Sequence, residues 1–221
     1  MIIAIDGPAG SGKSTIARNI AEYFSITFMN TGSFYRGVTL ALLRSMGSKP
    51  DGSGGVLPDL SNEQKIIDFA RSVNLDYRNS HLYLDNEDVE IYLRSDAVES
   101  IVAPLSAIVE VRHILNEKIR KIARATGVVC EGRDMTTVVF PDADFKFYLD
   151  ASVSARALRR YNQGTSSKSL SDLEAAIAER DDVDRNKKEG SLKIAPDAFY
   201  IDTSDLTIEV VCAIIISKIQ I

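Results

Sequence analysis

Short apolar runs alternate along this chain with longer segments in which apolar residues recur every three or four positions. The runs lie at residues 2–5, 26–29, 128–130, 145–149 and 198–201 and are typical of buried strands. The segments between them, such as residues 108–122, have the period of amphipathic helices. This alternation predicts an α/β fold: a doubly wound, mostly parallel sheet of about five strands with helices on both faces.

Residues 73–93 follow a different pattern, in which every second residue is apolar. Val73, Leu75 and Tyr77 form the first such segment, and two more at 82–84 and 89–93 follow across turns at 79–80 and 85–87. Three short alternating strands in series predict an antiparallel β meander. We place it in an inserted subdomain over residues 49–95, after a Gly- and Pro-rich loop that begins at 47. The alternative is two loops and one edge hairpin on the main sheet.

The helical pattern of residues 152–188 is interrupted by a polar loop at 163–169, so this segment predicts two helices. Ser171 and Glu174 have the spacing of a capping box at the start of the second helix. Basic residues cluster on both helices: Arg156, Arg159, Arg160, Arg180, Arg185, Lys187 and Lys188. Guanidinium groups bind phosphate oxygens bidentately, so we expect a mobile lid that closes over phosphates and excludes water. The alternative is a solvated face paired with Asp181, Asp182 and Asp184. The remaining residues, 1–48, 96–151 and 189–221, form the predicted core.

A glycine-rich segment joins the first apolar run to the first helical segment. Its glycines allow several backbone N–H groups to point inward at a helix N-terminus, where they bind anions. Lys13 can then reach the β- and γ-phosphates of a nucleotide, and the Ser14 hydroxyl can ligate Mg²⁺. The alternative is a glycine-rich turn with a lysine by chance. The strand, glycine loop and helix order predicts a nucleoside-triphosphate site, a P-loop, formed by Gly7, Pro8, Ala9, Gly10, Ser11, Gly12, Lys13, Ser14 and Thr15.

Composition narrows the class of protein. The net charge of -5 argues against general binding to nucleic acid or to a membrane surface, so any arginine cluster serves a local anion. Cys130 and Cys212 lie far apart in apolar surroundings, and we expect buried free thiols in a reducing compartment. The chain has no signal peptide pattern and no apolar stretch long enough to span a membrane. We therefore expect a cytoplasmic protein, and a monomer because no unexplained apolar surface stripe is visible.

Two further arginines, Arg36 and Arg133, follow strand ends, and a third, Arg112, lies on a predicted helix. Arg36 follows a strand end and the turn Thr31-Gly32, which favours a ligand contact. Arg133-Asp134 follows the strand at 128–130, at the edge where open α/β sheets bind ligands. Arg112 is equally well explained as the polar edge of an amphipathic helix.

No side chain stands out as a general base. His81 lies in the meander and His113 on a helix, and both read as ordinary surface or packed imidazoles. An alcohol acceptor would need a base to remove its proton. An acceptor that is a phosphate monoester, with a second pKa near 6, is largely dianionic at neutral pH and needs none. This absence favours transfer to a phosphate, with charge neutralised by Mg²⁺, Lys13 and arginines.

With these motifs the chain resembles the bacterial cytidylate kinases of the nucleoside monophosphate kinase family. The resemblance runs nearly from end to end and includes the enlarged insert. It is carried by the P-loop, by Glu131-Gly132-Arg133-Asp134-Met135 and by Glu179-Arg180-Asp181-Asp182, with Thr31-Gly32, Tyr35-Arg36, Val111-Arg112 and Asp184-Arg185-Asn186 in addition.

The resemblance implies magnesium-dependent transfer of the γ-phosphate of ATP to CMP or dCMP, with ATP as co-substrate, Mg²⁺ as cofactor and Ser14 as metal ligand. The implied CMP contacts are Thr31, Tyr35, Arg36, Arg112, Arg133, Asp134, Arg180, Asp184 and Lys187. The implied catalytic groups are Lys13, Arg133, Asp134, Arg156, Arg159 and Arg185. Asn30, Val183 and Lys187 stand where the family usually has Asp, Arg and Arg, and a lysine cannot make a planar bidentate contact.

Other functions explain the sequence less well. A P-loop kinase for another acceptor, such as UMP or a small alcohol metabolite, is the main alternative. A GTPase would need an Asp-x-x-Gly after a core strand and a base-reading Asn-Lys-x-Asp, for which Asn186-Lys187-Lys188-Glu189 is only a near match. A non-catalytic nucleotide-binding module is disfavoured because Lys13, Ser14 and the arginines are all present.

Overall fold

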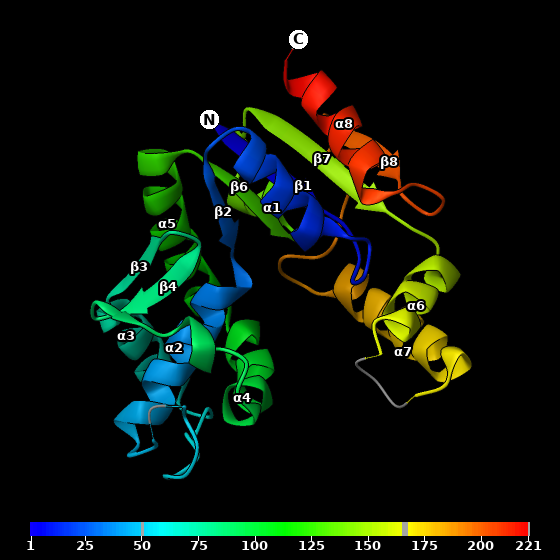
Figure 1. Ribbon diagram of the computed structural model, residues 1–221. Helices are drawn as coiled ribbons and strands as arrows, with labels where there is room; N and C mark the ends of the chain where they lie inside the picture. Colours follow the sequence, from blue (N-terminus) through cyan, green and yellow to red (C-terminus); the bar gives the residue numbers. More distant parts are fainter. Residues whose placement is uncertain (50, 165–167, 221) are drawn as a thin grey trace. The chain divides into compact units, whose positions relative to one another are not determined.

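Figure 1 shows the computed structural model, which describes residues 1–49, 51–164 and 168–220. The chain forms two compact units: unit 1 is Met1–Phe28 with Gly127–Ile221, and unit 2 is Met29–Thr126. The predicted loops at 47–62 and 163–169 include residues 50 and 165–167, which lie outside the described residues. Within the described part, no helix is both long enough and apolar enough to cross a membrane.

The main sheet has five strands in the order β2-β6-β1-β7-β8. These are β1 (Ile2–Asp6), β2 (Thr27–Asn30), β6 (Val128–Gly132), β7 (Phe145–Asp150) and β8 (Phe199–Asp202). β1 pairs in parallel with β6, Ile3 opposite Val129, and with β7, Ile3 opposite Phe145. The predicted parallel α/β sheet is therefore confirmed, with β1 and its P-loop at the centre (Figure 1).

The central strands read as continuous apolar runs because side chains on both of their faces are buried. Ile3 and Ile5 of β1 have no exposed surface, and neither does Val129 of β6. Helices α1 (Lys13–Tyr23) and α8 (Ile208–Ile219) pack against each other and against this sheet, and Ile16 and Ile215 join the same core cluster. Cys130 and Cys212 are buried and free. Each fully buried aliphatic side chain contributes about 1.5–3 kcal/mol.

Two antiparallel helices follow β7 in unit 1. They are α6 (Val153–Asn162) and α7 (Leu170–Asn186), which pack on each other through a small apolar cluster of Ala157, Leu173 and Ile177 (Figure 1). The prediction of two helices is confirmed, but the capping box is not where we expected it. Ser169 is the N-cap and its hydroxyl accepts a hydrogen bond from the Asp172 amide at 3.2 Å, so α7 begins one residue before Ser171.

Unit 2 combines four helices with a small sheet among its described residues. The helices are α2 (Gly32–Ser45), α3 (Glu63–Ser72), α4 (Asp96–Ala107) and α5 (Val109–Thr126). The strands β3 (Leu75–Arg78), β4 (His81–Leu84) and β5 (Glu87–Asp88) form an antiparallel sheet in that order, which confirms the meander. Both turns between them, Asn79-Ser80 and Asp85-Asn86, have two consecutive residues of positive φ, the geometry of tight hairpin turns.

The third strand of the meander is shorter than predicted. β5 ends at Asp88, and Glu90–Tyr92 form a 3₁₀ turn in which Ile91 is 81% exposed. The cause is local: Oδ1 of Asp88 accepts a hydrogen bond from the Glu90 amide at 3.1 Å and turns the chain. Val89 and Leu93 are buried whereas Ile91 between them is exposed, so the three side chains do not share one face as they would in a strand, and the pattern is that of a helical turn.

Helix α4 was not predicted. Ser95 caps it, and Asp96 and Glu99 lie in its first turn, where acidic residues favour a helix. Pro104 lies inside this helix, and a proline there argues against a helix when only the sequence is read. The end of α4 at Ala107 is followed by α5 at once, so the amphipathic pattern beginning at Ile108 marks a second helix.

Candidate active site

The P-loop connects β1 to α1 and has an open helix N-terminus. Gly7, Gly10 and Gly12 have φ of 149°, 81° and 91°, a backbone region that favours glycine. Gly7 also lies against β7, because a Cβ on it would be 2.0 Å from the Leu149 carbonyl oxygen. Gly12 is the N-cap of α1 and supplies no side chain to its first amides. An uncapped first turn of this kind is suited to bind phosphate oxygens.

Lys13 is folded back on the P-loop. Its Nζ donates to the Pro8 carbonyl at 2.7 Å and to Ser11 Oγ at 3.4 Å, and the residue is 4% exposed. Burial, with the nearby charge of Arg133, lowers the pKa of Lys13 to about 7. Near neutral pH the ammonium is therefore close to half ionised, and a bound polyanion would favour its charged form.

Ser14 lies beside a carboxylate that the sequence reading did not select. Its Oγ donates to Glu131 Oε1 at 3.0 Å, and Glu131 is placed by the pairing of β6 with β1. A hydroxyl and a carboxylate oxygen side by side are the hard oxygen donors that Mg²⁺ prefers. The residues present therefore fit the predicted metal, and Glu131 joins Ser14 as a candidate ligand.

Arg133 and Lys187 meet on one carboxylate. Arg133 Nε donates to Asp184 Oδ2 at 2.8 Å, and Lys187 Nζ donates to Asp184 Oδ1 at 2.5 Å. Burial alone would raise the pKa of Asp184, but the hydrogen bonds from Lys187 and Arg133 outweigh it and hold that pKa below its ordinary value. The neighbour of Arg133, Asp134, is 4% exposed. The structure thus brings Arg133, Asp184 and Lys187 together.

Arg156 links the helix pair to the P-loop. Its Nη1 and Nη2 donate to the Asp181 carboxylate at 3.0 and 2.6 Å, and Nη1 also donates to the Ala9 carbonyl at 3.1 Å. The sequence places Asp181 in the motif at 179–182 and in the solvated alternative, neither of which predicts that it is only 2% exposed. Arg156 therefore lies against the P-loop and has a buried partner.

The other basic residues of α6 and α7 differ in their surroundings. Arg159 donates to the Thr203 and Ser204 carbonyls, which follow β8. A cavity of about 300 Å³ is lined by Gly10 of the P-loop with Arg156, Arg159, Arg160 and Gln163. Arg180 and Arg185 are exposed on α7, and the charge of Arg185 acts on Tyr148 of β7. The structure thus brings the α6 arginines to the P-loop.

The predicted acceptor residues of unit 2 gather at the start of α2. Thr31 is the N-cap of α2 and is 4% exposed, and Arg112 of α5 lies over the Tyr35 ring at 5.6 Å. Arg36 Nε donates to Glu99 Oε1 of α4 at 2.8 Å. Asn30, which stands where the family usually has Asp, accepts a hydrogen bond from the Gly32 amide at 3.0 Å. The predicted acceptor residues therefore form two sets, this one in unit 2 and the Arg133 set in unit 1.

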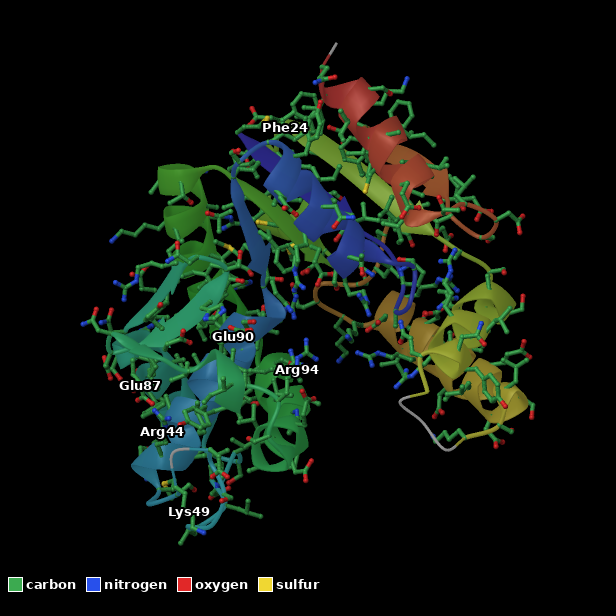
Figure 2. The ribbon with its side chains drawn as sticks, in the orientation of Figure 1. Phe24, Arg44, Lys49, Glu87, Glu90 and Arg94 are labelled. Carbon is green, nitrogen blue, oxygen red and sulfur yellow. The ribbon has the colours of Figure 1, made fainter. Side chains whose placement is uncertain are left out.

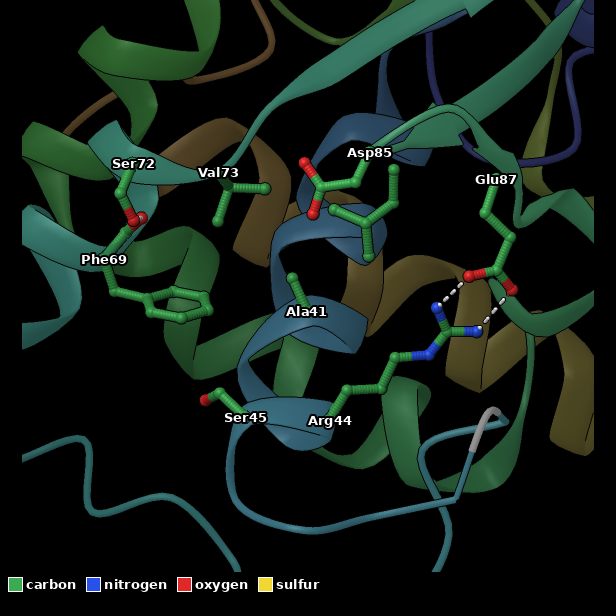
Figure 3. Close-up of a pocket in the computed structure, with 9 residues that line it drawn as sticks. Ala41, Arg44, Ser45, Phe69, Ser72, Val73, Asp85 and Glu87 are labelled. Atoms are coloured by element: carbon green, nitrogen blue, oxygen red, sulfur yellow. Dashed lines mark hydrogen bonds and ion pairs between the residues drawn. The ribbon is translucent and has the colours of Figure 1, made fainter.

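A second cavity, of about 370 Å³, lies elsewhere in unit 2 between α2, α3 and the small sheet. Figure 3 shows Arg44 of α2 paired with Glu87 of β5 at its edge, at 2.8 and 3.0 Å, and Figure 2 places both residues in the molecule. None of the predicted site residues lines it. Its lining residues are Ala41, Arg44, Ser45, Phe69, Ser72, Val73, Leu84, Asp85 and Glu87.

Comparison with known proteins agrees with this geometry. The family described as Cytidylate kinase matches residues 3–221. The cytidylate kinase of Borreliella burgdorferi (strain ZS7) is 40% identical over 223 residues, covering 100% of this chain and 97% of that protein. The cytidylate kinase of Borrelia duttonii (strain Ly) is 39% identical, covering 100% and 99%.

Among solved structures, an uncharacterized protein from Eubacterium ventriosum ATCC 27560 has a TM-score of 0.52 at 14% identity, covering 100% of this chain and 98% of that one. That similarity is one of fold alone. The match along the sequence confirms the resemblance, and the chain belongs to the cytidylate kinase family.

Proposed function

We propose that this chain carries out the reaction after which its family is named, the transfer of the γ-phosphate of ATP to CMP or dCMP to give CDP or dCDP and ADP. The observation that carries the proposal is the family match over residues 3–221, which includes the P-loop and both sets of basic residues. The same match gives no support to UMP or a small alcohol as the acceptor.

The P-loop is the proposed ATP site. Its open helix N-terminus receives the β- and γ-phosphates, and Lys13 turns from the Pro8 carbonyl to the phosphates. The cavity lined by Gly10 and the α6 arginines supports a polyphosphate at this place, because it joins the P-loop backbone to three guanidinium groups. Arg185 and Arg180 on α7 add positive charge to the same helix pair.

Mg²⁺ is the proposed cofactor, held by Ser14 Oγ and Glu131 together with phosphate oxygens. When bound, Mg²⁺ neutralises charge that develops on the phosphates. The pairing of β1 with β6 places the Glu131 carboxylate beside the Ser14 hydroxyl at the end of the P-loop.

The proposed acceptor contacts are the two sets already described. By the family resemblance, Arg36, Arg112 and Arg133 are the proposed contacts of the acceptor phosphate. Arg180, Asp184 and Lys187 are the proposed contacts of its sugar. Thr31, Tyr35 and Asp134 complete this set. The acceptor phosphate is largely dianionic at neutral pH, so its oxygen attacks without a general base. Positioning and charge neutralisation then account for catalysis.

We extend the proposal to the organisation of the chain. Residues 49–95 are the acceptor-binding insert and residues 152–188 the lid that excludes water from the triphosphate. We also propose a cytoplasmic monomer that does not bind nucleic acid or membranes. The two buried free thiols support a reducing compartment, and the net charge of -5 argues against binding to nucleic acid or to a membrane surface.

A coupled ADP-release assay tests the reaction. It compares CMP, dCMP, UMP, AMP, GMP and shikimate as acceptors at fixed ATP and Mg²⁺. We expect turnover to be fastest with CMP or dCMP. Faster turnover with any of the other four acceptors, or none with CMP and dCMP, would contradict the proposal.

A further inference from the structure

Asp6, the last residue of β1, is fully buried, and both oxygens of its carboxylate accept hydrogen bonds. Oδ1 accepts from the Met135 amide at 2.8 Å, and Oδ2 accepts from the Thr136 amide and hydroxyl at 2.7 and 2.6 Å. Met135 and Thr136 begin a π-helical turn, Met135–Val139. The carboxylate of Asp6, in strand β1, therefore caps the N-terminus of that turn. A negative charge is favourable at this position, because it accepts hydrogen bonds from the first amides of the turn.

Only two residues, Arg133 and Asp134, separate the end of β6 from this turn. At one end Gly132 is paired with Asp6 in the β1–β6 ladder, and at the other end Met135 is bonded to the Asp6 carboxylate. A single residue therefore holds the backbone on both sides of the segment. The Met135 side chain packs back over Gly132, since a Cβ on Gly132 would lie 2.7 Å from Met135 Cε.

The backbone of Arg133 and Asp134 is therefore held in place at both ends. Arg133 donates from Nε to Asp184, and Asp134 is buried. Releasing the amides of Met135 and Thr136 would loosen both residues at once, while β1 would still be held by its pairing with β7.

We propose that Asp6 is a positioning residue for the nucleoside monophosphate acceptor: it fixes Arg133 and Asp134 in place and touches neither nucleotide. This inference rests on the proposed function, in which Arg133 and Asp134 bind the acceptor. It concerns the acceptor rather than ATP, because the hydrogen bonds of the Asp6 side chain go to the segment after β6.

The charge state of Asp6 agrees with this role. Burial raises the pKa of Asp6 to about 6, and the hydrogen bonds from Thr136 and Met135 oppose that rise. The charge of Asp134 also raises it, and Lys13 is a nearby cation. Above neutral pH the carboxylate is ionised, and it then offers lone pairs to all of these donors.

The test begins with Asp6→Asn, which keeps the shape but places an amide NH₂ against backbone donors. We expect the KM for CMP to rise by about tenfold to a hundredfold, as for a misplaced binding group. The KM for ATP should stay within about twofold of the wild type. The dissociation constant of CMP, measured by calorimetry without ATP, should rise with its KM.

Two threonines provide matched variants that leave Asp6 in place. Thr136→Val removes one of the hydrogen bonds to Asp6, and Thr136→Ser retains the hydroxyl. Thr137→Val makes the same change one residue later, where the hydroxyl has no hydrogen-bond partner among the residues that the structure describes. We expect Thr136→Val to raise the KM for CMP several-fold, with Thr136→Ser and Thr137→Val near the wild type.

The outcomes separate this inference from the proposed function. If the wild type does not phosphorylate CMP, the proposed function fails. If the wild type does so but Asp6→Asn raises both KM values equally, or Thr136→Val behaves like Thr137→Val, the role of Asp6 is wrong. The threonine comparison decides the question even if Asp6→Asn does not fold.

Discussion

Arg156 and Asp181 form a bidentate ion pair between α6 and α7, with side chains only 2% and 3% exposed. Removing one partner of such a pair leaves a buried charge that has lost its counter-charge. We expect Asp181→Ala to lower the free energy of unfolding by about 3–5 kcal/mol. Denaturant unfolding would measure this loss.

The double variant Arg156→Met/Asp181→Leu serves as the control, because it removes both charges and keeps apolar volume. We expect it to recover most of the stability lost in Asp181→Ala. Its turnover should stay low, since Arg156 is a proposed phosphate contact. Recovery of stability and of full turnover together would contradict a role for Arg156 in catalysis.

Lys13 is the group on which turnover should depend most. We expect Lys13→Ala to lower kcat by about a hundredfold to a thousandfold, as when a positioned donor is removed from a developing charge. The fold should persist, because among the residues that the structure describes the side chain bonds to its own loop, at Pro8 and Ser11. Steady-state kinetics and circular dichroism would check both statements, and a near-normal kcat would refute the role of Lys13.

Nucleotide binding should also change the protonation of Lys13. Its pKa of about 7 in the free protein means that the amine is mostly neutral at pH 8. Bound phosphates favour the ammonium, so binding of ATP at pH 8 should take up close to one proton. The uptake should fade as the pH falls below 7, where the free protein already carries the proton.

Calorimetry in two buffers of different ionisation enthalpy would measure this uptake. Lys13→Arg is the matched control, because an arginine remains charged throughout this pH range. Equal proton uptake by the wild type and Lys13→Arg would assign it to another group.

Arg36 tests the acceptor set of unit 2. Its ion pair with Glu99 is partly exposed, so losing that pair should cost little stability. We expect Arg36→Ala to raise the KM for CMP by about tenfold or more while the KM for ATP changes little. Glu99→Gln leaves the guanidinium in place and should keep the KM for CMP near the wild type. A fall in ATP affinity alone would mean that Arg36 does not contact the acceptor.

The features best predicted from the sequence are those whose cause is local. β1 and β6 were recognisable because strands buried on both faces have uninterrupted apolar runs, and the P-loop because its glycines are spaced for one backbone shape. The turns predicted at 79–80 and 85–87 were recognisable because short polar residues there separate alternating segments. The structure has positive φ at 79–80 and 85–86.

Other features depend on contacts between residues that are far apart in the sequence. Asp181 meets Arg156, Glu99 meets Arg36, and Asp6 meets Thr136 across 25, 63 and 130 residues. Each of these carboxylates looks ordinary in its own segment. At two places the local sequence pattern was ambiguous. Pro104 argues against a helix although it lies inside α4, and the apolar spacing of residues 89–93 suits both a strand and a helical turn.

The short span between Gly132 and Met135 has a consequence for how this sequence can vary. Asp6 is paired with Gly132 on one side of Arg133 and Asp134 and bonded to the Met135 amide on the other. The two-residue span between these contacts therefore cannot change in length without breaking one of them. A one-residue insertion or deletion there would detach the turn from β1, whereas a substitution at either position would not. Relatives that share this arrangement should therefore differ at these positions by replacement and never by gaps.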